Sequence, residues 1–499
     1  MQTKIQIDIA KDTEKTCRES FRVPDGLSRL HFSVKRPKDF PGTGFLAVYD
    51  AMGRLRLQKM IAYGEQELGI GELARDNTAG SVGGKIPGGE WYLLYGNLFT
   101  EWNSYGGTFP IFIEIEISDQ RSTLTDPMEL IWTKDEDDFR INETLFDWNK
   151  IYLTGGAWYL GDFHTHTRLS DGKETLKHAM EKAMDMGMDF YVPTEHNLVH
   201  TGWTQTSLCV IPGVEITLPL GHFNLFGITE RTKFLDRLML CENETEMKEY
   251  TTAIIKEAND KGWLVSINHP FLHIWKWHLD EVELDQIQCL EIVNDPTYQF
   301  AKEANDKAIS FLDVLWEDGH RITGIGGSDS HNLIDERYPG AEEPSVAGDP
   351  GTYVYSKALS PNRILKATGA GNVIVTRHCR LIPKIYGETK AYLPGDKVTE
   401  EEIIYECKIT DTKEEPVVYL VGNAESGKFV KKSLIVEERE DYFFVKCSLF
   451  MNQNRWSWAR MEVRDKNGLF MGYVNPIYAG TKKSKYQTFG EMKMLWGLE

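Results

Sequence analysis

The pattern of apolar and polar positions divides the chain into three segments with different rhythms. The first segment, residues 18–118, carries short apolar runs separated by turn signals such as Pro24-Asp-Gly26. These runs lie at 30–34, 45–49, 91–95 and 110–117. Short strands between Pro- and Gly-containing turns are typical of a β-sandwich. We therefore predict an N-terminal β-sandwich domain with its connector over residues 1–150.

The middle segment alternates strand-like runs with helical periodicity. Strands are expected at about 158–166, 189–193, 208–211, 223–226, 263–267, 289–293 and 322–325, and helices at about 174–186, 246–261 and 300–318. This alternation favours a parallel α/β arrangement, and about seven strands suggest that the sheet curls into a barrel. We predict this barrel-like domain over residues 151–378.

The strand pattern returns in the last segment. Apolar runs lie at 403–405, 417–421, 442–445 and 460–463. They predict a C-terminal β-rich domain over residues 379–499. A chain of 499 residues is too long for one hydrophobic core. The expected fold class is therefore α/β, a barrel flanked by two β-sandwich-like domains.

Charge and composition narrow the class of partner. The chain has 56 basic and 75 acidic residues, a net charge of −19. Such a surface repels polyphosphate, which disfavours a long nucleic-acid groove but leaves a small anionic substrate open. No run approaches the roughly 18 apolar residues of a membrane span, and the first ten residues show no leader, so we expect a cytoplasmic protein without membrane contact. The sequence leaves open whether the protein forms a homo-oligomer.

Metal-ligand side chains follow the predicted strands of the middle segment. His164 and His166 close the first strand, and their spacing of two places both imidazoles on one face. The later motifs add Asp171, His196, Glu215, His269, Asp329 and His331. The C-terminal strand ends of such a barrel meet at one rim. We therefore expect these eight side chains to converge.

The ligand types predict the chemistry. Nitrogen and oxygen ligands without sulfur suit Zn²⁺, Mn²⁺ or Fe²⁺. One ion takes three or four protein ligands, so eight ligands imply two or three divalent ions, with Glu215 the best candidate for a bridge. Closely spaced ions polarise a substrate oxygen and lower the pKa of a bridging water, whose hydroxide serves as the nucleophile. The pattern predicts a multinuclear metal-dependent hydrolase.

Other polar and aromatic residues near these motifs are candidates for substrate contact. His222 could face the metals, Asn294 could orient the substrate, and Arg168 could neutralise a phosphate oxygen. Each also has a plain structural interpretation, such as a histidine bonded to backbone or a solvated loop arginine. Arg377 is a weaker candidate for the task of Arg168. Three tryptophans near the motifs could stack on an aromatic substrate: Trp203, Trp275 and Trp277.

The motifs taken together resemble those of the polymerase-and-histidinol-phosphatase (PHP) family. They are His164-Thr-His-Thr-Arg-Leu-Ser-Asp-Gly172, Glu195-His-Asn197, Pro212-Gly-Val-Glu215, Asn268-His-Pro270 and Gly327-Ser-Asp-Ser-His331. The resemblance covers about residues 158–378. It implies a distorted seven-stranded barrel with two or three metal ions, and mainly phosphoesterase activity. Glu195 stands where the family more often has aspartate, and we expect it to support the site without binding metal.

The flanking segments resemble one branch of that family, the carbamate-hydrolase (CehA/McbA-like) branch. The resemblance rests on Phe21-Arg-Val-Pro-Asp-Gly26, on Gly88-Gly-Glu-Trp91 and on Asn475-Pro-Ile-Tyr478. That branch has a Gly-His pair at the position of Gly221-His222, which implies a substrate contact or a general acid. Its β-domains surround the barrel.

Three functions follow, in this order. The leading one is a phosphoesterase that acts on a small phosphate mono- or diester. The alternative is a carbamate, ester or amide hydrolase, in which the same nucleophile attacks a carbonyl carbon. The third is a non-catalytic metal-containing binding protein, which the complete ligand set disfavours.

Overall fold

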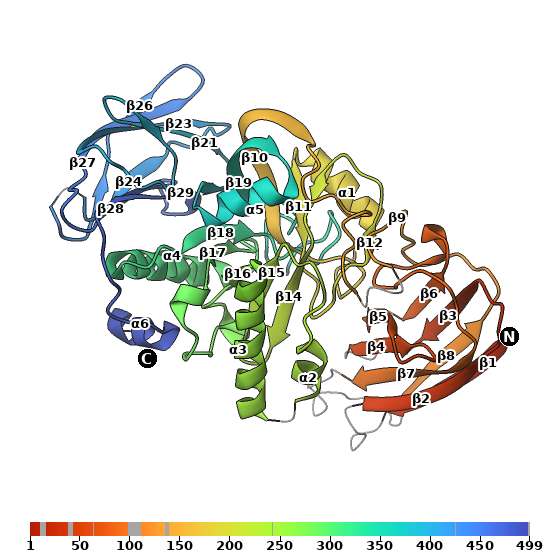
Figure 1. Ribbon diagram of the computed structural model, residues 1–499. Coiled ribbons are helices and arrows are strands. Elements are labelled where there is room, and N and C mark those ends of the chain that lie inside the picture. Colours follow the sequence, from red (N-terminus) through yellow and green to blue (C-terminus); the bar gives the residue numbers. More distant parts are fainter. Residues whose placement is uncertain are drawn as a thin grey trace.

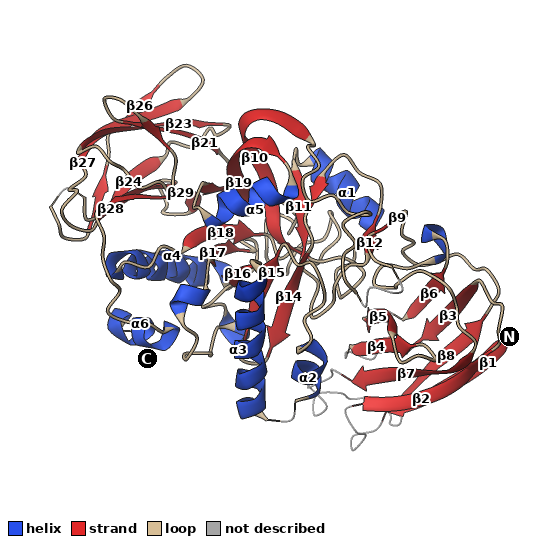
Figure 2. Cartoon of the chain, in the orientation of Figure 1, coloured by secondary structure: helices blue, strands red, loops and turns tan. Residues whose placement is uncertain are grey.

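The protein is a mixed α/β structure with β-rich domains at both ends of the chain. The computed structural model describes residues 1–9, 16–37, 43–62, 64–97, 111–134, 139–241, 243–424 and 426–497. The N-terminal strands lie at one end of the molecule and the C-terminal strands at the other (Figure 1). The longer helices pack around the central strands between them (Figure 2). No helix among the described residues is long and apolar enough to cross a membrane.

Two antiparallel sheets form the N-terminal domain. One has the order β1 (Gln2–Ile9), β8 (Ile111–Ser118), β3 (Arg29–Lys35) and β6 (Glu65–Gly71); the other has β2 (Thr16–Val23), β7 (Gly89–Asn97), β4 (Gly44–Tyr49) and β5 (Leu55–Ile61). Alternation builds the core: Ile113, Ile115 and Ile117 are buried, whereas Glu114 between the first two is exposed. The predicted β-rich domain is thus present. Pro110, at the start of the last predicted run, lies outside the described residues.

Eight strands and their helices surround the site region. They belong to two sheets, one containing β10 (Leu153–Thr165), β11 (Phe190–Pro193) and β13 (Cys209–Val210), and one with the order β14 (Gly213–Leu218), β15 (Gly221–Phe226), β16 (Leu264–Ile267), β17 (Cys289–Asn294) and β18 (Thr323–Gly327). The three predicted helices are confirmed as α1 (Leu176–Asp185), α3 (Glu244–Lys261) and α4 (Ala301–Asp318). The short α2 (Leu235–Leu240) precedes α3.

The strand ladders of the described residues do not close into one barrel. Single bridges join the two sheets at both seams, Thr165 with Ser330 and His196 with Glu215. The sheets are also mixed, because β15 runs antiparallel to both β14 and β16. Only Pro219 and Leu220 connect β14 to β15, and a two-residue link permits a hairpin but not a parallel crossover. The expectation of an all-parallel sheet was therefore wrong.

The first of these sheets continues into the C-terminal segment. Beyond β10 its order is β19 (Gly351–Leu359), β20 (Val373–Thr376), β29 (Phe470–Ala479), β28 (Ser457–Arg464), β24 (Val417–Gly422) and β25 (Val430–Ser433). A five-stranded sheet packs nearby, with β22 (Ala391–Tyr392), β21 (Arg380–Tyr386), β23 (Glu402–Thr410), β27 (Phe443–Phe450) and β26 (Val436–Glu438). Helices α5 (Pro361–Gly369) and α6 (Phe489–Trp496) and the pair β9 (Leu130–Ile131) and β12 (Gly202–Trp203) complete the α-helices and strands of the described residues. The domain limits at 150 and 378 stay predictions.

Candidate metal centre

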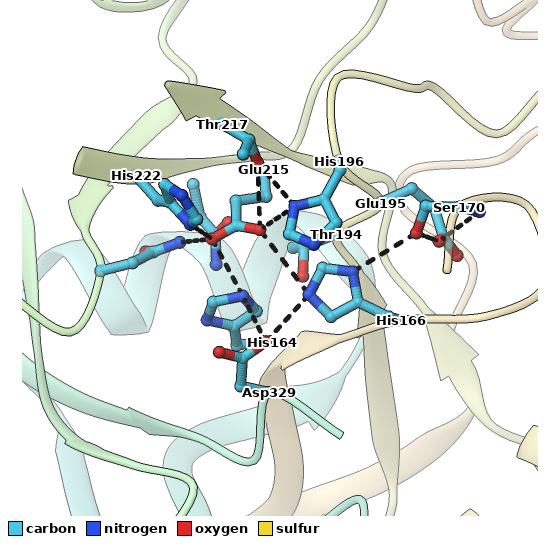
Figure 3. A network of polar contacts seen from close by, with 12 residues as sticks. His164, His166, Ser170, Thr194, Glu195, His196, Glu215, Thr217, His222 and Asp329 are labelled. Carbon is cyan, nitrogen blue, oxygen red and sulfur yellow. Dashed lines mark hydrogen bonds and ion pairs between the residues drawn. The ribbon is translucent and has the colours of Figure 1, made fainter. Parts of the chain in front are cut away.

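The candidate ligands converge from both sheets onto one buried region, and Figure 3 labels five of them there, His164, His166, His196, Glu215 and Asp329. His164 is the second-to-last residue of β10, and His166 follows that strand. Glu215 lies in the middle of β14 and not at a strand end, which corrects the expectation from the sequence. The other five candidate ligands follow strands: Asp171 after β10, His196 after β11, His269 after β16, and Asp329 and His331 after β18. All eight are brought together.

Glu215 is the centre of this region. Its Oε1 atom lies 3.2 Å from Nε2 of His164 and 3.1 Å from Nδ1 of His222. Its Oε2 atom lies 2.6 Å from Nδ1 of His196. The amide of Asn268 donates to Oε1 at 2.9 Å. The two carboxylate oxygens therefore face different sets of imidazoles, as a bridging carboxylate does.

Asp329 forms the second acidic point of the region. Its Oδ1 atom lies 3.0 Å from Nε2 of His166 and 3.3 Å from Nε2 of His164. Its backbone N–H donates to the carbonyl of His164 at 2.8 Å, which fixes the Asp329 backbone at a φ of 50°. Aspartate tolerates this left-handed conformation better than most residues do.

A third group lies toward the solvent. Nε2 of His331 is 3.4 Å from Oδ1 of Asp171 and 3.4 Å from Nε2 of His196. The ring of His331 stacks on that of His166 with centroids 4.1 Å apart. Side-chain exposure rises from 0% for His166 to 33% for Asp171. The cluster thus grades from a closed interior to an open rim.

The protonation states differ among the imidazoles of the cluster. Asp329 and other carboxylates outweigh burial and raise the pKa of His164, and Asp171 and Glu215 do the same for His196, so these two rings must release a proton to coordinate a cation. Burial, together with the neighbouring His331 and His196, lowers the pKa of His166 to about 4, so this imidazole is neutral at pH 7. Burial alone would raise the pKa of Glu215, but the surrounding imidazoles, His164 first among them, hold it well below its usual range. Neutral imidazoles and ionised carboxylates are the forms that coordinate cations.

The donor set fits divalent ions. Three groups have ligand atoms within 4.8 Å of one another: His166, Asp171, His196 and His331; His164, His166 and Glu215; and His196, Glu215 and His222. Oδ1 of Asp329 lies 3.0 and 3.3 Å from Nε2 of His166 and of His164, yet none of these three buried atoms makes a hydrogen bond of good geometry within the described residues. Buried polar atoms are normally satisfied, and a shared cation would satisfy all three.

Two glutamates support the ligands from behind. Oε1 of Glu291 lies 3.0 Å from Nδ1 of His164, and its Oε2 accepts from the backbone N–H of His269 at 2.9 Å. Glu195 accepts from the backbone N–H groups of Thr167 at 2.9 Å and Ser170 at 3.1 Å. It thereby holds the loop that carries Asp171, the supporting role expected for it.

The remaining predicted site residues divide between the site and other regions. Nδ2 of Asn294 lies 3.3 Å from Oδ2 of Asp329, and both Asn294 and His222 line the cavity over the cluster. Arg168 is absent from the described lining, and its charge acts on buried Lys59 and Asp126. Arg377 lines a different pocket, where it pairs with Asp349 at 3.0 Å and with Glu343.

Sequence reasoning missed several polar neighbours of the ligands. Glu291 carried a signal, an acid within the apolar run 289–293, because a buried carboxylate needs a partner. Asn268 stood inside a quoted motif without being given a role. Asp295 and Tyr338 gave no signal; Tyr338 donates its hydroxyl to Asp295 at 2.6 Å, and both line the cavity. These residues are 43 positions apart, beyond any local pattern.

Comparison with known proteins adds little. No family model and no curated protein matches the chain. Among solved structures, a crystal structure from Bifidobacterium adolescentis, described as a candidate metal-dependent phosphoesterase, aligns with 38% of this chain and 92% of its own at 14% sequence identity. The TM-score is 0.23, a value that establishes neither the fold nor the reaction of this chain.

Proposed function

We propose that the chain is a metal-dependent hydrolase of small phosphate esters. The observation that carries the proposal is the position of Glu215, whose two oxygens face separate imidazoles at 3.2 and 2.6 Å. The PHP resemblance supports it, because all eight ligand positions are filled. The seven strands β10, β11 and β14 to β18, with single bridges at two seams, are compatible with the distorted barrel of that family.

The proposed cofactors are two or three divalent ions. The three ligand groups share His166, His196 and Glu215. One imidazole nitrogen binds one ion, so the groups cannot all be complete at once, whereas the carboxylate of Glu215 can be shared. When bound, the ions would polarise the ester oxygen and activate water for attack on phosphorus.

The protein side chains would hold this site in place. Glu291 fixes the ring of His164, and Glu195 fixes the loop of Asp171. Asn294 contacts Asp329, and His222 contacts Glu215. Both Asn294 and His222 line the cavity, and they are the proposed substrate contacts. Arg168 is not retained as a phosphate contact, because other residues line the described cavity.

A carbonyl ester, carbamate or amide is the second candidate substrate. It is favoured by the absence of lysine and arginine among the described residues that line the cavity. A carbonyl substrate needs no cation beyond the metal ions, whereas phosphate sites commonly add arginine. The two functions therefore differ in the bond that is cut and share one metal site.

A substrate panel tests the proposal. Protein loaded separately with Mn²⁺, Zn²⁺ and Fe²⁺ is assayed on bis-p-nitrophenyl phosphate, p-nitrophenyl phosphate, p-nitrophenyl acetate and an aryl N-methylcarbamate. The proposal expects turnover of a phosphate ester that His164→Ala and His166→Ala abolish. Turnover of only the carbonyl substrates would support the second candidate. Metal binding without turnover of any substrate would support a non-catalytic protein.

A further inference from the structure

The cavity over the metal centre has two chemically different ends. Its volume is about 1010 Å³, far more than a phosphate group fills. One end is lined by Asp171, His196, His222 and other residues of the cluster. The opposite end is lined by side chains of the N-terminal domain and of α2. The site is thus a metal cluster at one end of a large chamber.

The wall that the N-terminal domain adds to this chamber consists of apolar side chains of its strands. Successive side chains of a strand point to opposite faces of the sheet. The run Phe45-Leu-Ala-Val-Tyr49 in β4 is apolar throughout, so both faces of the sheet must be covered there. Leu46 and Val48 belong to the core between the two N-terminal sheets. Phe45 and Ala47 point the other way and line the chamber.

Neighbouring strands continue the same wall. In the sheet register Phe45 pairs with Met60 of β5, and Ala47 pairs with Leu94 of β7. Met60 and Leu94 also line the chamber. Residues directly opposite on adjacent strands share one face, so this wall is a continuous apolar surface of a rigid sheet.

Helices α2 and α3 add further apolar side chains to the lining. Leu238, Met239 and Leu240 of α2 and Met247 of α3 line the chamber. Trp275 lies at its edge and is 38% exposed, whereas Trp203 and Trp277 are buried away from it. Of the three tryptophans considered from the sequence, only Trp275 can reach a ligand.

The charges of the chamber exclude a polyanion. Apart from the candidate metal ligands Asp171 and Asp329, the carboxyl side chains of the described lining are Asp236 and Asp295, and the described lining contains no lysine or arginine. A second phosphate, as in a nucleoside diphosphate, would meet acidic groups without a compensating cation. An uncharged apolar group would meet complementary surface.

From this arrangement we infer that the chamber between the N-terminal sheet and α2 binds the non-reacting group of the substrate, and that this group is large, apolar and uncharged. The inference rests on the proposed function and specifies its substrate class, an ester with an aryl or long alkyl group. Burial of a phenyl group against such a wall strengthens binding by about 10- to 100-fold over a methyl group.

Two measurements test this inference. The first compares kcat/KM of metal-loaded protein for p-nitrophenyl phenyl phosphate, p-nitrophenyl methyl phosphate and thymidine 5′-(p-nitrophenyl phosphate), which share one leaving group. We expect the phenyl ester to exceed the other two by at least about tenfold. The second measures binding of phenylphosphonate and methylphosphonate by calorimetry, which needs no turnover. If no diester is cleaved but phenylphosphonate binds more tightly, the proposed function fails and the chamber assignment stands.

Variants locate the binding surface. Leu94→Asp on β7 and Met239→Asp on α2 each place a charge in the apolar lining and should each reduce the phenyl preference by about tenfold. Met52→Asp is the matched control, because Met52 is in the same domain, 70% exposed and outside the lining. The two variants lie on different elements, so loss of folding in one leaves the other informative. Equal affinity for both phosphonates, or an unchanged preference in the folded variants, would overturn the inference.

Discussion

Nδ1 of His164 lies 3.0 Å from Oε1 of Glu291, and both side chains are almost wholly buried. A carboxylate can only accept, so this contact places the imidazole proton on Nδ1. Nε2 faces Glu215 and Asp329, and neighbouring carboxylates, Asp329 first among them, outweigh burial and raise the pKa of this ring, so a cation that binds Nε2 would displace a proton from it. Such carboxylate–histidine pairs orient metal ligands and increase their basicity.

We therefore expect Glu291→Gln to weaken metal binding without removing a ligand. Affinity for Zn²⁺ or Mn²⁺ should fall by about 10- to 100-fold, as measured by competition with a chromogenic chelator. Glu257→Gln is the matched control, because Glu257 is buried and hydrogen-bonded to Thr232 outside the site. Equal affinity of the Glu291 variant and the native protein would show that this contact does not support a metal ligand.

Metal binding should stabilise the fold measurably. An ion that binds only the folded chain adds about 2.7 kcal/mol at a hundredfold excess over its Kd. Thermal unfolding with increasing Mn²⁺ or Zn²⁺ should therefore show a rising Tm that chelator reverses. The shift should be largely lost in Glu215→Ala, because this carboxylate belongs to two of the three ligand groups. An identical shift in that variant would place the ions elsewhere.

A buried ion network far from the site should dominate local stability. Arg460 is fully buried and contacts Asp313 with two nitrogens at 2.6 and 2.7 Å and Glu462 at 2.9 Å. Arg460→Met leaves buried carboxylates short of a cation, so the free energy of unfolding should fall by about 3–5 kcal/mol in chemical denaturation. Arg439→Met at an exposed ion pair should change it by less than about 0.5 kcal/mol. Similar effects of both would contradict the role of burial.

The same network predicts a pH dependence. Burial alone would raise the pKa of Glu462, but Arg460 and Arg464 outweigh it and hold that pKa well below 4.5. As the pH falls below about 5, the unfolded chain takes up a proton that the folded chain refuses, so stability falls. Glu462→Gln should flatten this acid limb in urea titrations between pH 3 and 6. Burial raises the pKa of Asp313, so the contribution of Asp313 to the pH dependence of stability has the opposite sign. An unchanged loss of stability at acid pH in the Glu462 variant would exclude Glu462 as the cause of that loss.

Local patterns were sufficient for the elements that carry most of the site. His269 and Asp329 follow short apolar runs, and such runs form strands wherever both faces are covered. The spacing of His164 and His166 predicted a shared face, and both reach Oδ1 of Asp329. These relationships depend on residues within one strand or on the common rim of adjacent strands, which periodicity can report.

Other features depend on contacts that periodicity does not report. The sequence predicted a strand at 208–211 with Glu215 beyond its end, but Glu215 lies inside β14, and the turn at Pro219-Leu220 joins β14 to β15 in a hairpin. The gaps at the two seams of the sheets have no sequence signal. The wall that β4 adds to the chamber had a partial one, its unbroken apolar run, but that run names no partner. Packing between distant segments decides such features.

The most direct test of the central claim titrates metal-free protein with Mn²⁺ while hydrolysis of bis-p-nitrophenyl phosphate and bound metal are measured on the same sample. The account predicts no hydrolysis without metal, activity that rises with bound metal to a plateau at two or three equivalents, and no activity in Glu215→Ala. Phosphate-ester hydrolysis that persists after metal removal, or its absence at full metal occupancy, would contradict the account.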